Sequence, residues 1–337
     1  MPIKPNLLPS TGKMTPGYAL TVTSNSQIVH EEFRGLAEMK TKKPIGRNTA
    51  FRLASLSKQF TAMAIMILEK RRRLNYDAPL SRFFPDFPNY GRNIAVRQLL
   101  THTSGMSDHE QPLYRQLKRN PRLVPNIYDS LKVLQRLDKL FFPAGTKYQY
   151  SDSGYVVLAL IIEKVSGLSY RDFLTKNIFK PLNMANSDVL DDTKPKIDNR
   201  AYGYRTLKNG FKLFDYDPLN YIVGDEGVYS SIVDMVKWSQ AWEKPLLVSN
   251  ESLDQALTSQ RLLNGKIGKA GFSWLIDSYR KEKIIYQDGL WVGFRNIILK
   301  IPNKNVSVII LSNRTDLETT KQRIAAAWPK KLLKMIR

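Results

Sequence analysis

Ser55 and Lys58 are the residues of this sequence whose types and spacing most directly indicate covalent chemistry. They lie three residues apart at the start of a stretch, Ser55 to Lys70, in which apolar residues and alanines recur at helical spacing. Side chains three apart share one face of a helix, here near the positive pole of its first turn. An amine in that position can take the proton of a serine and make it a nucleophile. The same residues also fit a capping serine followed by a solvated lysine, so further motifs are needed to decide.

Further motifs follow this pair in a characteristic order. They read Leu99-Leu-Thr-His102-Thr-Ser-Gly105, then Phe141-Phe-Pro143-Ala-Gly145 leading to Tyr150-Ser-Asp152-Ser-Gly154-Tyr155, then Val223-Gly-Asp-Glu-Gly227, and finally Tyr286-Gln287-Asp-Gly289-Leu-Trp-Val-Gly293-Phe-Arg295. Together with Ser55-x-x-Lys58, this order resembles the serine β-lactamase and penicillin-binding-protein superfamily. It is most similar to the class C β-lactamases, the D-alanyl-D-alanine carboxypeptidases and related esterases. The resemblance extends from about Gly17 to the C-terminus.

The resemblance implies a covalent mechanism at Ser55. Ser55 would attack an acyl carbon and form an acyl-enzyme, while Lys58 and Tyr150 share the proton transfers. The backbone amides of Ser55 and Leu290 would hold the oxyanion. Gly289 is expected to leave room for a substrate to lie against its strand.

Two positions depart from the family pattern. The tyrosine motif usually ends in asparagine but ends here in Asp152, and the third motif usually begins with lysine or histidine but begins here with Gln287. In the family, that cation helps to hold the carboxylate that penicillins and D-alanyl-D-alanine peptides share. We therefore expect Asp152, Gln287, Gly289 and Arg295 to contact the substrate, with Arg295 either replacing the missing cation or pointing away along its strand. These changes favour an esterase-like serine hydrolase with weak or absent β-lactamase activity.

Asp152 also bears on which group acts as the base. A lysine base works best when its pKa falls from about 10.4 toward about 7 to 8. A carboxylate about 4 Å away opposes that change, by about 4 kcal/mol at an effective dielectric constant near 20. The sequence therefore predicts that Lys58 stays an ammonium and that Tyr150 is the principal base, its phenolate favoured by the neighbouring cation.

Other functions remain open at this point. The chain could be a D-alanyl-D-alanine carboxypeptidase or a β-lactamase, or a catalytically degenerate relative that binds a cell-wall or other anionic polymer. A Ser-His-Asp hydrolase is disfavoured because the sequence has no Gly-x-Ser-x-Gly motif.

Composition narrows the classes further. The sequence has no cysteine and only three histidines, His30, His102 and His109, so neither a disulfide nor a metal or other cofactor is expected. We interpret His102 as part of a structural turn. The formal net charge of +22 favours contact with anionic polymers, but no motif predicts specific nucleic-acid binding.

Export is not indicated by the sequence as it stands. It has no run of about 18 apolar residues, and residues 1–14 do not resemble a signal peptide. The expected location is the cytoplasm, or the periplasm or exterior if this is a trimmed mature form.

The element pattern predicts an α/β (α+β) fold. The predicted β-type segments flank the predicted helical segments. The β-type segments lie at 18–23, 27–33, 272–278, 283–287, 291–301 and 305–312. The helical segments lie at 55–73, 96–100, 126–139, 154–164, 170–179 and 232–242, and a last helix from about Thr315 closes the chain. Strands at both ends favour one antiparallel sheet with flanking helices and an inserted, mainly helical lobe. We expect a single β-lactamase/transpeptidase-like domain over 1–337, with lobes at about 15–80 plus 228–337 and at 81–227.

Overall fold

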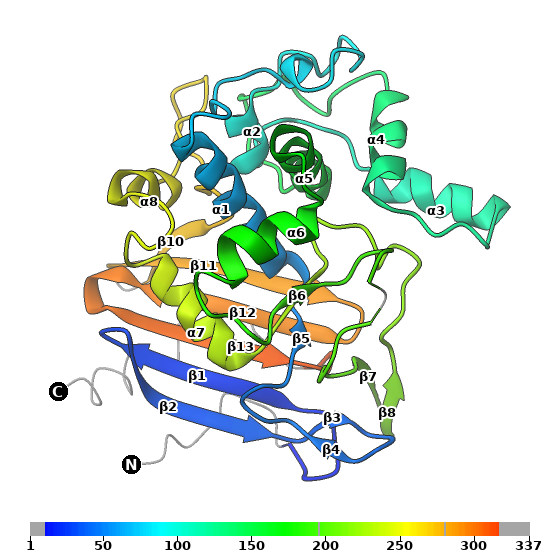
Figure 1. Ribbon diagram of the computed structural model, residues 1–337, viewed down its shortest axis with the longest axis vertical. Coiled ribbons are helices and arrows are strands. Elements are labelled where there is room, and N and C mark those ends of the chain that lie inside the picture. The colour runs from blue at the N-terminus through cyan, green and yellow to red at the C-terminus, as the bar shows by residue number, and fades with distance from the viewer. Residues whose placement is uncertain (1–10, 195, 280, 317–337) are drawn as a thin grey trace.

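One antiparallel sheet joins the two ends of the chain. The computed structural model describes residues 11–194, 196–279 and 281–316 (Figure 1). The sheet order is β10-β11-β12-β13-β1-β2, so β1, near the start of the described chain, pairs with β13, near its end. The strands are β1 (Tyr18–Ser24), β2 (Gln27–Arg34), β10 (Leu275–Tyr279), β11 (Glu282–Trp291), β12 (Phe294–Ile301) and β13 (Val306–Ser312). The predicted fold class is confirmed.

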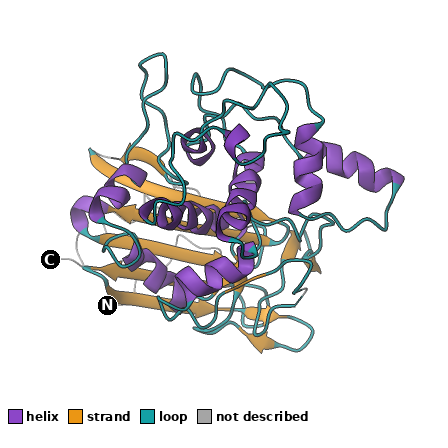
Figure 2. Cartoon of the chain, turned by 45° about the horizontal axis from the view of Figure 1, so that its top comes forward, coloured by secondary structure: helices purple, strands orange, loops and turns teal. Residues whose placement is uncertain are grey.

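The central strands are apolar on both faces. In β13, Ile309 and Leu311 belong to the large core that the helices cover, whereas Val308 and Ile310 pack in a second cluster on the opposite face. This follows from the two-residue repeat of a strand, which sends alternate side chains to opposite sides. Figure 2 shows the helices lying against one face of the sheet.

The helices reproduce most of the predicted pattern. A 3-10 turn (Ala54–Leu56) leads into α1, which packs against α5, and both helices are buried over most of their length. The helices are α1 (Ser57–Lys70), α2 (Val96–Leu100), α3 (Glu110–Arg119), α4 (Ile127–Gln135), α5 (Asp152–Ser166), α6 (Tyr170–Leu174, continuing through 175–179), α7 (Ile232–Ala241) and α8 (Asn250–Ala256). The sequence did not predict α3 or α8.

Short strands connect the sheet to the segments around Ser55. In the order β5-β9-β6, Arg52 pairs with Tyr229, so the residues before Ser55 run beside the residues that follow Gly227. The short strands are β3 (Leu36–Glu38), β4 (Lys43–Pro44), β5 (Phe51–Arg52), β6 (Asp188–Val189), β7 (Tyr204–Leu207), β8 (Gly210–Leu213) and β9 (Val228–Ser230).

The structure does not test two of the predictions, the division into lobes and the C-terminal helix. The division into lobes remains a prediction, and the C-terminal helix lies almost entirely outside the described residues. Among the described helices, none is long and apolar enough to span a membrane alone. The segments Asp152–Ser166 and Tyr170–Phe179 meet that test only as a pair bent by 76°.

Candidate active site

Ser55 and Lys58 face each other, as their spacing predicts. Ser55 lies in the 3-10 turn just before α1, and Lys58 lies in the first turn of α1. The Lys58 Nζ donates a hydrogen bond to the Ser55 Oγ at 3.2 Å. The Lys58 side chain is 0% exposed, which excludes the alternative of a solvated lysine.

Lys58 is held by Asp152 and by the chain at Asp225. Its Nζ lies 2.5 Å from the Asp152 Oδ1 and donates to the Asp225 backbone oxygen at 3.0 Å. Burial alone would lower the pKa of Lys58, but the negative charge of Asp152, the strongest opposing influence, leaves that pKa well above its ordinary value. The pKa of Asp152 is correspondingly lowered, because the Lys58 charge outweighs the effect of burial. The geometry agrees with the predicted ammonium form of Lys58.

Tyr150 completes the group around Lys58. The Lys58 Nζ lies 5.0 Å from the centroid of the Tyr150 ring. Withdrawal from bulk water raises the pKa of Tyr150, and the Lys58 charge only partly counteracts this. The Lys58 charge thus favours the phenolate, as predicted, but burial of the hydroxyl has the larger effect on the pKa.

The His102 ring packs against the Tyr150 ring. Its ring stacks on the Tyr150 ring with centroids 4.5 Å apart, and its Nδ1 accepts a hydrogen bond from the Ser151 backbone N–H at 3.0 Å. Burial lowers the pKa of His102 to about 3, so the imidazole is neutral at ordinary pH. These contacts support the structural interpretation of His102.

Gly289 lies where no side chain fits. The sequence predicted that the missing side chain leaves room for a substrate, but the structure gives a different reason. A Cβ at this position would lie 2.2 Å from the Leu53 backbone oxygen and 3.2 Å from the Leu56 backbone nitrogen. The space beside Gly289 is therefore filled by the turn that carries Ser55 and not by substrate. This close approach brings Leu290, next on β11, to the same cavity wall as Ser55.

Asn296 fixes the same approach from the neighbouring strand. Its buried Nδ2 donates to the backbone oxygens of Arg52 at 2.9 Å and Leu53 at 3.2 Å. Its Oδ1 accepts from the Ser312 N–H at 3.2 Å. The sequence did not single out Asn296, because its role depends on a contact across the sheet.

Gln287 lies elsewhere than expected, and Arg295 takes the second of its two expected positions, pointing away from the cavity. Gln287 is only 1% exposed, and its Nε2 donates to the Asp288 backbone oxygen at 3.1 Å. Alternate residues of β11, Asp288 and Leu290, line the cavity instead. The Arg295 Nη1 donates to the backbone oxygens of Val292 at 3.2 Å and Phe294 at 2.6 Å, so this guanidinium is directed onto its own turn.

The resulting cavity has a volume of about 380 Å³ and an acidic wall. Among the described residues, its lining comprises Ser55, Glu110, Tyr150, Asp152, Glu226, Leu275, Asp288, Leu290 and Trp291. Four of these are carboxylic acids, and none is lysine or arginine. Of these acids, Asp152 has a lowered pKa and keeps its negative charge, whereas burial raises the pKa of Glu110 and Glu226.

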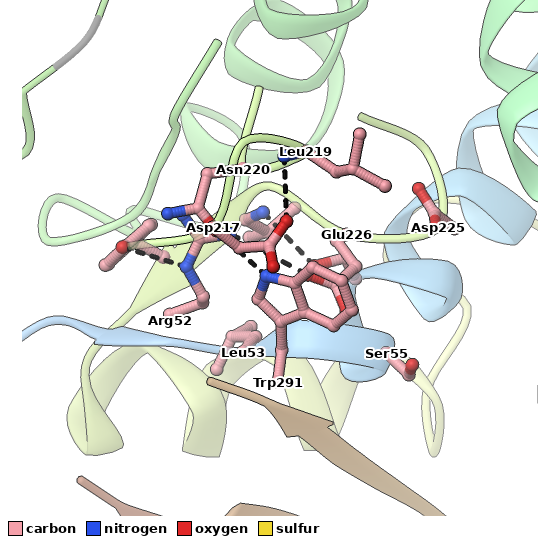
Figure 3. A network of polar contacts seen from close by, with 12 residues as sticks. Arg52, Leu53, Ser55, Asp217, Leu219, Asn220, Asp225, Glu226 and Trp291 are labelled. Atoms are coloured by element: carbon pink, nitrogen blue, oxygen red, sulfur yellow. Dashed lines mark hydrogen bonds and ion pairs between the residues drawn. The ribbon is translucent and has the colours of Figure 1, made fainter. Parts of the chain in front are cut away.

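One side of the cavity is fixed by a polar network (Figure 3). The Trp291 Nε1 donates to the Asn220 Oδ1 at 2.8 Å, and the Leu219 N–H donates to Asp217 at 2.9 Å. Behind the tryptophan, the buried Arg52 lies 3.7 Å from Glu226. These contacts fix the positions of the Trp291 and Glu226 side chains in the cavity lining.

Comparison with known proteins agrees with this arrangement. The model of the beta-lactamase family matches residues 10–329. The chain belongs to the beta-lactamase family. This confirms the resemblance to the serine β-lactamase and penicillin-binding-protein superfamily.

Relatives of this beta-lactamase-family chain bear penicillin-binding-protein names. Penicillin-binding protein 4* of Bacillus subtilis (strain 168) is 33% identical over 323 residues, which are 92% of this chain and 71% of that protein. The putative penicillin-binding protein PbpX of the same organism is 32% identical over 238 residues, 70% of this chain and 57% of PbpX. Among solved structures, the octameric penicillin-binding protein homologue from Pyrococcus abyssi has a TM-score of 0.79 and 25% identity, covering 96% of this chain and 74% of that one.

The Asp152 charge gives this family member a testable pH dependence. Since Asp152 raises the pKa of Lys58, loss of the lysine proton is confined to high pH in the native chain. Asp152→Asn removes that charge, and burial then lowers the pKa of Lys58. We expect the acidic limb of the kcat/KM profile for a p-nitrophenyl ester to move to lower pH.

The control for this measurement is a surface carboxylate. Asp77 pairs with Arg97 at 2.9 Å and is largely exposed, so Asp77→Asn should leave the profile unchanged. A profile that Asp152→Asn does not move would show that the Lys58 proton does not control the measured rate.

Proposed function

We propose that this protein is a serine hydrolase of esterase type, acting through an acyl-enzyme on Ser55, with weak or no β-lactamase activity. The observation that carries the proposal is the contact of Ser55 with a buried Lys58, at the edge of a cavity whose described lining holds carboxylates and no lysine or arginine. The beta-lactamase family supplies the precedent for the covalent mechanism, and the acidic lining argues for the substrate preference.

The proposed reaction begins with attack of the Ser55 Oγ on the carbonyl carbon of an ester. Tyr150, in the phenolate form that the Lys58 charge favours, takes up the hydroxyl proton, and the pair then passes a proton to the leaving alcohol. The backbone amides of Ser55 and Leu290 hold the oxyanion during this step. Water then attacks the acyl-enzyme by the reverse proton path, releases the acid and restores the Ser55 hydroxyl.

Charge in the cavity argues against substrates with a carboxylate. Hydrogen bonds to charged groups contribute about 1.5–3 kcal/mol, against about 1 kcal/mol for neutral ones. Loss of a carboxylate-binding cation therefore costs up to about thirtyfold in transition-state stabilisation. Asp152 adds a negative charge to the same lining, which also contains Asp288. Penicillins and D-alanyl-D-alanine peptides carry that carboxylate, whereas small neutral esters do not.

The test compares two chromogenic substrates. We expect kcat/KM for a short-chain p-nitrophenyl ester to exceed that for a chromogenic cephalosporin by at least about a hundredfold, allowing for the more activated ester as well as for the lost cation. Asp288→Asn should shift the ratio toward the cephalosporin because Asp288 lines the cavity, whereas Gln287→His should change it little because Gln287 is buried outside the described lining. Efficient cephalosporin turnover by the native protein, or a ratio that Asp288→Asn did not move, would contradict the proposed preference.

The exposed basic clusters support a further part of the proposal, which is binding to an anionic polymer. The basic clusters Lys40–Lys43 and Lys70–Arg73 are exposed, whereas the described cavity lining is acidic. We propose that these surfaces bind an anionic polymer, which would concentrate the enzyme near ester groups attached to it. Binding to teichoic acid should weaken roughly tenfold or more between low salt and 0.5 M salt, because ions screen exposed charges. Binding that did not change with salt would exclude this electrostatic attraction.

A further inference from the structure

Three side chains with metal-ligand chemistry converge beside the catalytic lysine. His109 and Glu110 stand at the start of α3, and Asp225 comes from the loop before β9. One ligand atom from each lies within 4.8 Å of the other two. All three line a small cavity of about 10 Å³, which has room for a single water or ion.

Asp225 lines this cavity and has an unsatisfied carboxylate oxygen. The residue is 4% exposed, and its Oδ1 has no hydrogen-bond partner in the described chain. A buried acceptor left unpaired costs about 1–3 kcal/mol, more if it is charged. Figure 3 shows that Asp225 and Glu226 extend to different sides of their loop, so the Asp225 carboxylate is not directed at the contact between Arg52 and Glu226.

The histidine is already oriented to ligate. The His109 Nδ1 lies 3.0 Å from the Ser153 Oγ, which fixes the ring and leaves the Nε2 as the coordinating atom. A hydrogen bond to the second ring nitrogen is the usual support of a metal-bound histidine.

The two carboxyl groups of the cluster lie close together beside this cavity. Ligand oxygens of Glu110 and Asp225 are within 4.8 Å of each other. A cation bound between them would supply the partner that the Asp225 Oδ1 lacks.

We propose that His109, Glu110 and Asp225 bind one divalent transition-metal ion, with Zn²⁺ as the best match. One imidazole and two carboxylates form a three-ligand set that suits tetrahedral zinc, with water as the fourth ligand. Mg²⁺ and Ca²⁺ require six or more oxygen ligands, which these three side chains do not supply. The backbone oxygen of Asp225 accepts the hydrogen bond from Lys58, so the ion would position the residue that holds the catalytic lysine.

The sequence alone did not predict this site. His109 and Glu110 are adjacent, which is not the spacing of zinc-binding helices, and the third ligand comes from a distant loop. Only the packing of α3 against that loop brings the three groups together.

The experiment uses the full chain with any histidine tag removed. Metal content after dialysis against Zn²⁺ and calorimetric titration with ZnCl₂ should give one bound ion per chain. Glu110→Gln and His109→Gln should weaken zinc binding by about 10- to 100-fold, and Asp225→Asn should abolish it. Zn²⁺ should raise the melting temperature of the native protein by a few degrees, on the order of 2–5 °C, and leave that of Asp225→Asn unchanged.

The matched control removes a histidine that lies near a different carboxylate. The His30 Nε2 lies 3.7 Å from Glu32 in the sheet, away from α3, so His30→Gln should bind zinc like the native protein. Glu110 is partly exposed, so Glu110→Gln tests the site even if Asp225→Asn does not fold. Loss of binding in His30→Gln alone would place the ion elsewhere and overturn the proposal.

A shared proton or a single water is the competing explanation for the cluster. In that case the native protein binds no stoichiometric zinc, and the uncharged amide of Asp225→Asn makes the protein at least as stable as the native one. These two results together would overturn the proposal, and neither measurement depends on hydrolytic activity.

Discussion

Ser55→Ala is expected to lower the rate of ester hydrolysis by about 10³- to 10⁶-fold, the range found when the nucleophile of a serine hydrolase is removed. The fold should remain intact, because Ser55 lies in a turn whose neighbours, Ala54 and Leu56, supply the buried contacts. The Ser55 hydroxyl receives the Lys58 hydrogen bond, and alanine leaves that ammonium with Asp152 and the Asp225 carbonyl. The measurements are kcat/KM for a p-nitrophenyl ester and the circular dichroism spectrum.

Intact mass provides a second readout for the same change. A fluorophosphonate should add one adduct to the native chain and none to Ser55→Ala. Ser57→Ala is the matched control, since Ser57 is the next serine along the chain and its Oγ accepts the Val228 N–H at 3.1 Å. That variant should lose stability yet still form the adduct. Retention of more than a few per cent of the native rate by Ser55→Ala would exclude a Ser55 acyl-enzyme.

Gly289→Ala should have the second largest effect. A Cβ placed 2.2 Å from the Leu53 carbonyl must displace either β11 or the Ser55 turn, and both are backbone. Overpacking of this kind costs about 1–3 kcal/mol of stability. A shift of about 1 Å between the Ser55 and Leu290 amides can lower the rate about a hundredfold. Thermal unfolding and kcat for ester hydrolysis would record the two effects separately.

Gly46→Ala is the control for this change. A Cβ at Gly46 meets no atom within 4 Å, and this glycine lies well before the catalytic turn. It should therefore retain native activity and stability. If Gly289→Ala behaved like Gly46→Ala, the close approach of β11 to the Ser55 turn would not be what positions the Leu290 amide.

Spacing along the sequence predicted the contact between residues that lie one helical turn apart. Ser55 and Lys58 are separated by three residues, and the charge on Asp152 was enough to indicate that Lys58 stays protonated. The hairpin of β1 and β2 likewise follows from alternation and a polar turn. These features depend on neighbours along the chain, which a sequence displays directly.

The face of β11 could not be predicted in the same way. Gln287 was expected to contact the substrate, but Asp288 and Leu290 line the cavity. A strand presents alternate residues to opposite sides, so the choice between Gln287 and Asp288 rests on how β11 packs against the Ser55 turn. That packing is set by Gly289, whose missing side chain was assigned to substrate instead of to the Leu53 carbonyl.

Residues contributed by distant segments were the least predictable. Glu110 begins α3, a helix that the sequence did not predict, and it reaches the cavity because α3 lies beside the loop at Asp225. Asn296 is one amide among many in the sequence, and its role appears only when β12 lies beside the Ser55 turn. Such contacts carry no periodic signal.

The pairing of β1 with β13 has a consequence for how the protein is made. Tyr18 lies opposite Ser312, so during synthesis the first strand leaves the ribosome long before its partner exists. Until then, one edge of the N-terminal hairpin lacks its partner strand and is open to pairing with other strands. The Ser55 turn also lacks its contacts with Gly289 and Asn296 until those later residues have been synthesised. A chain that lacks β11 and β12 would therefore carry Ser55 without the residues that position its turn.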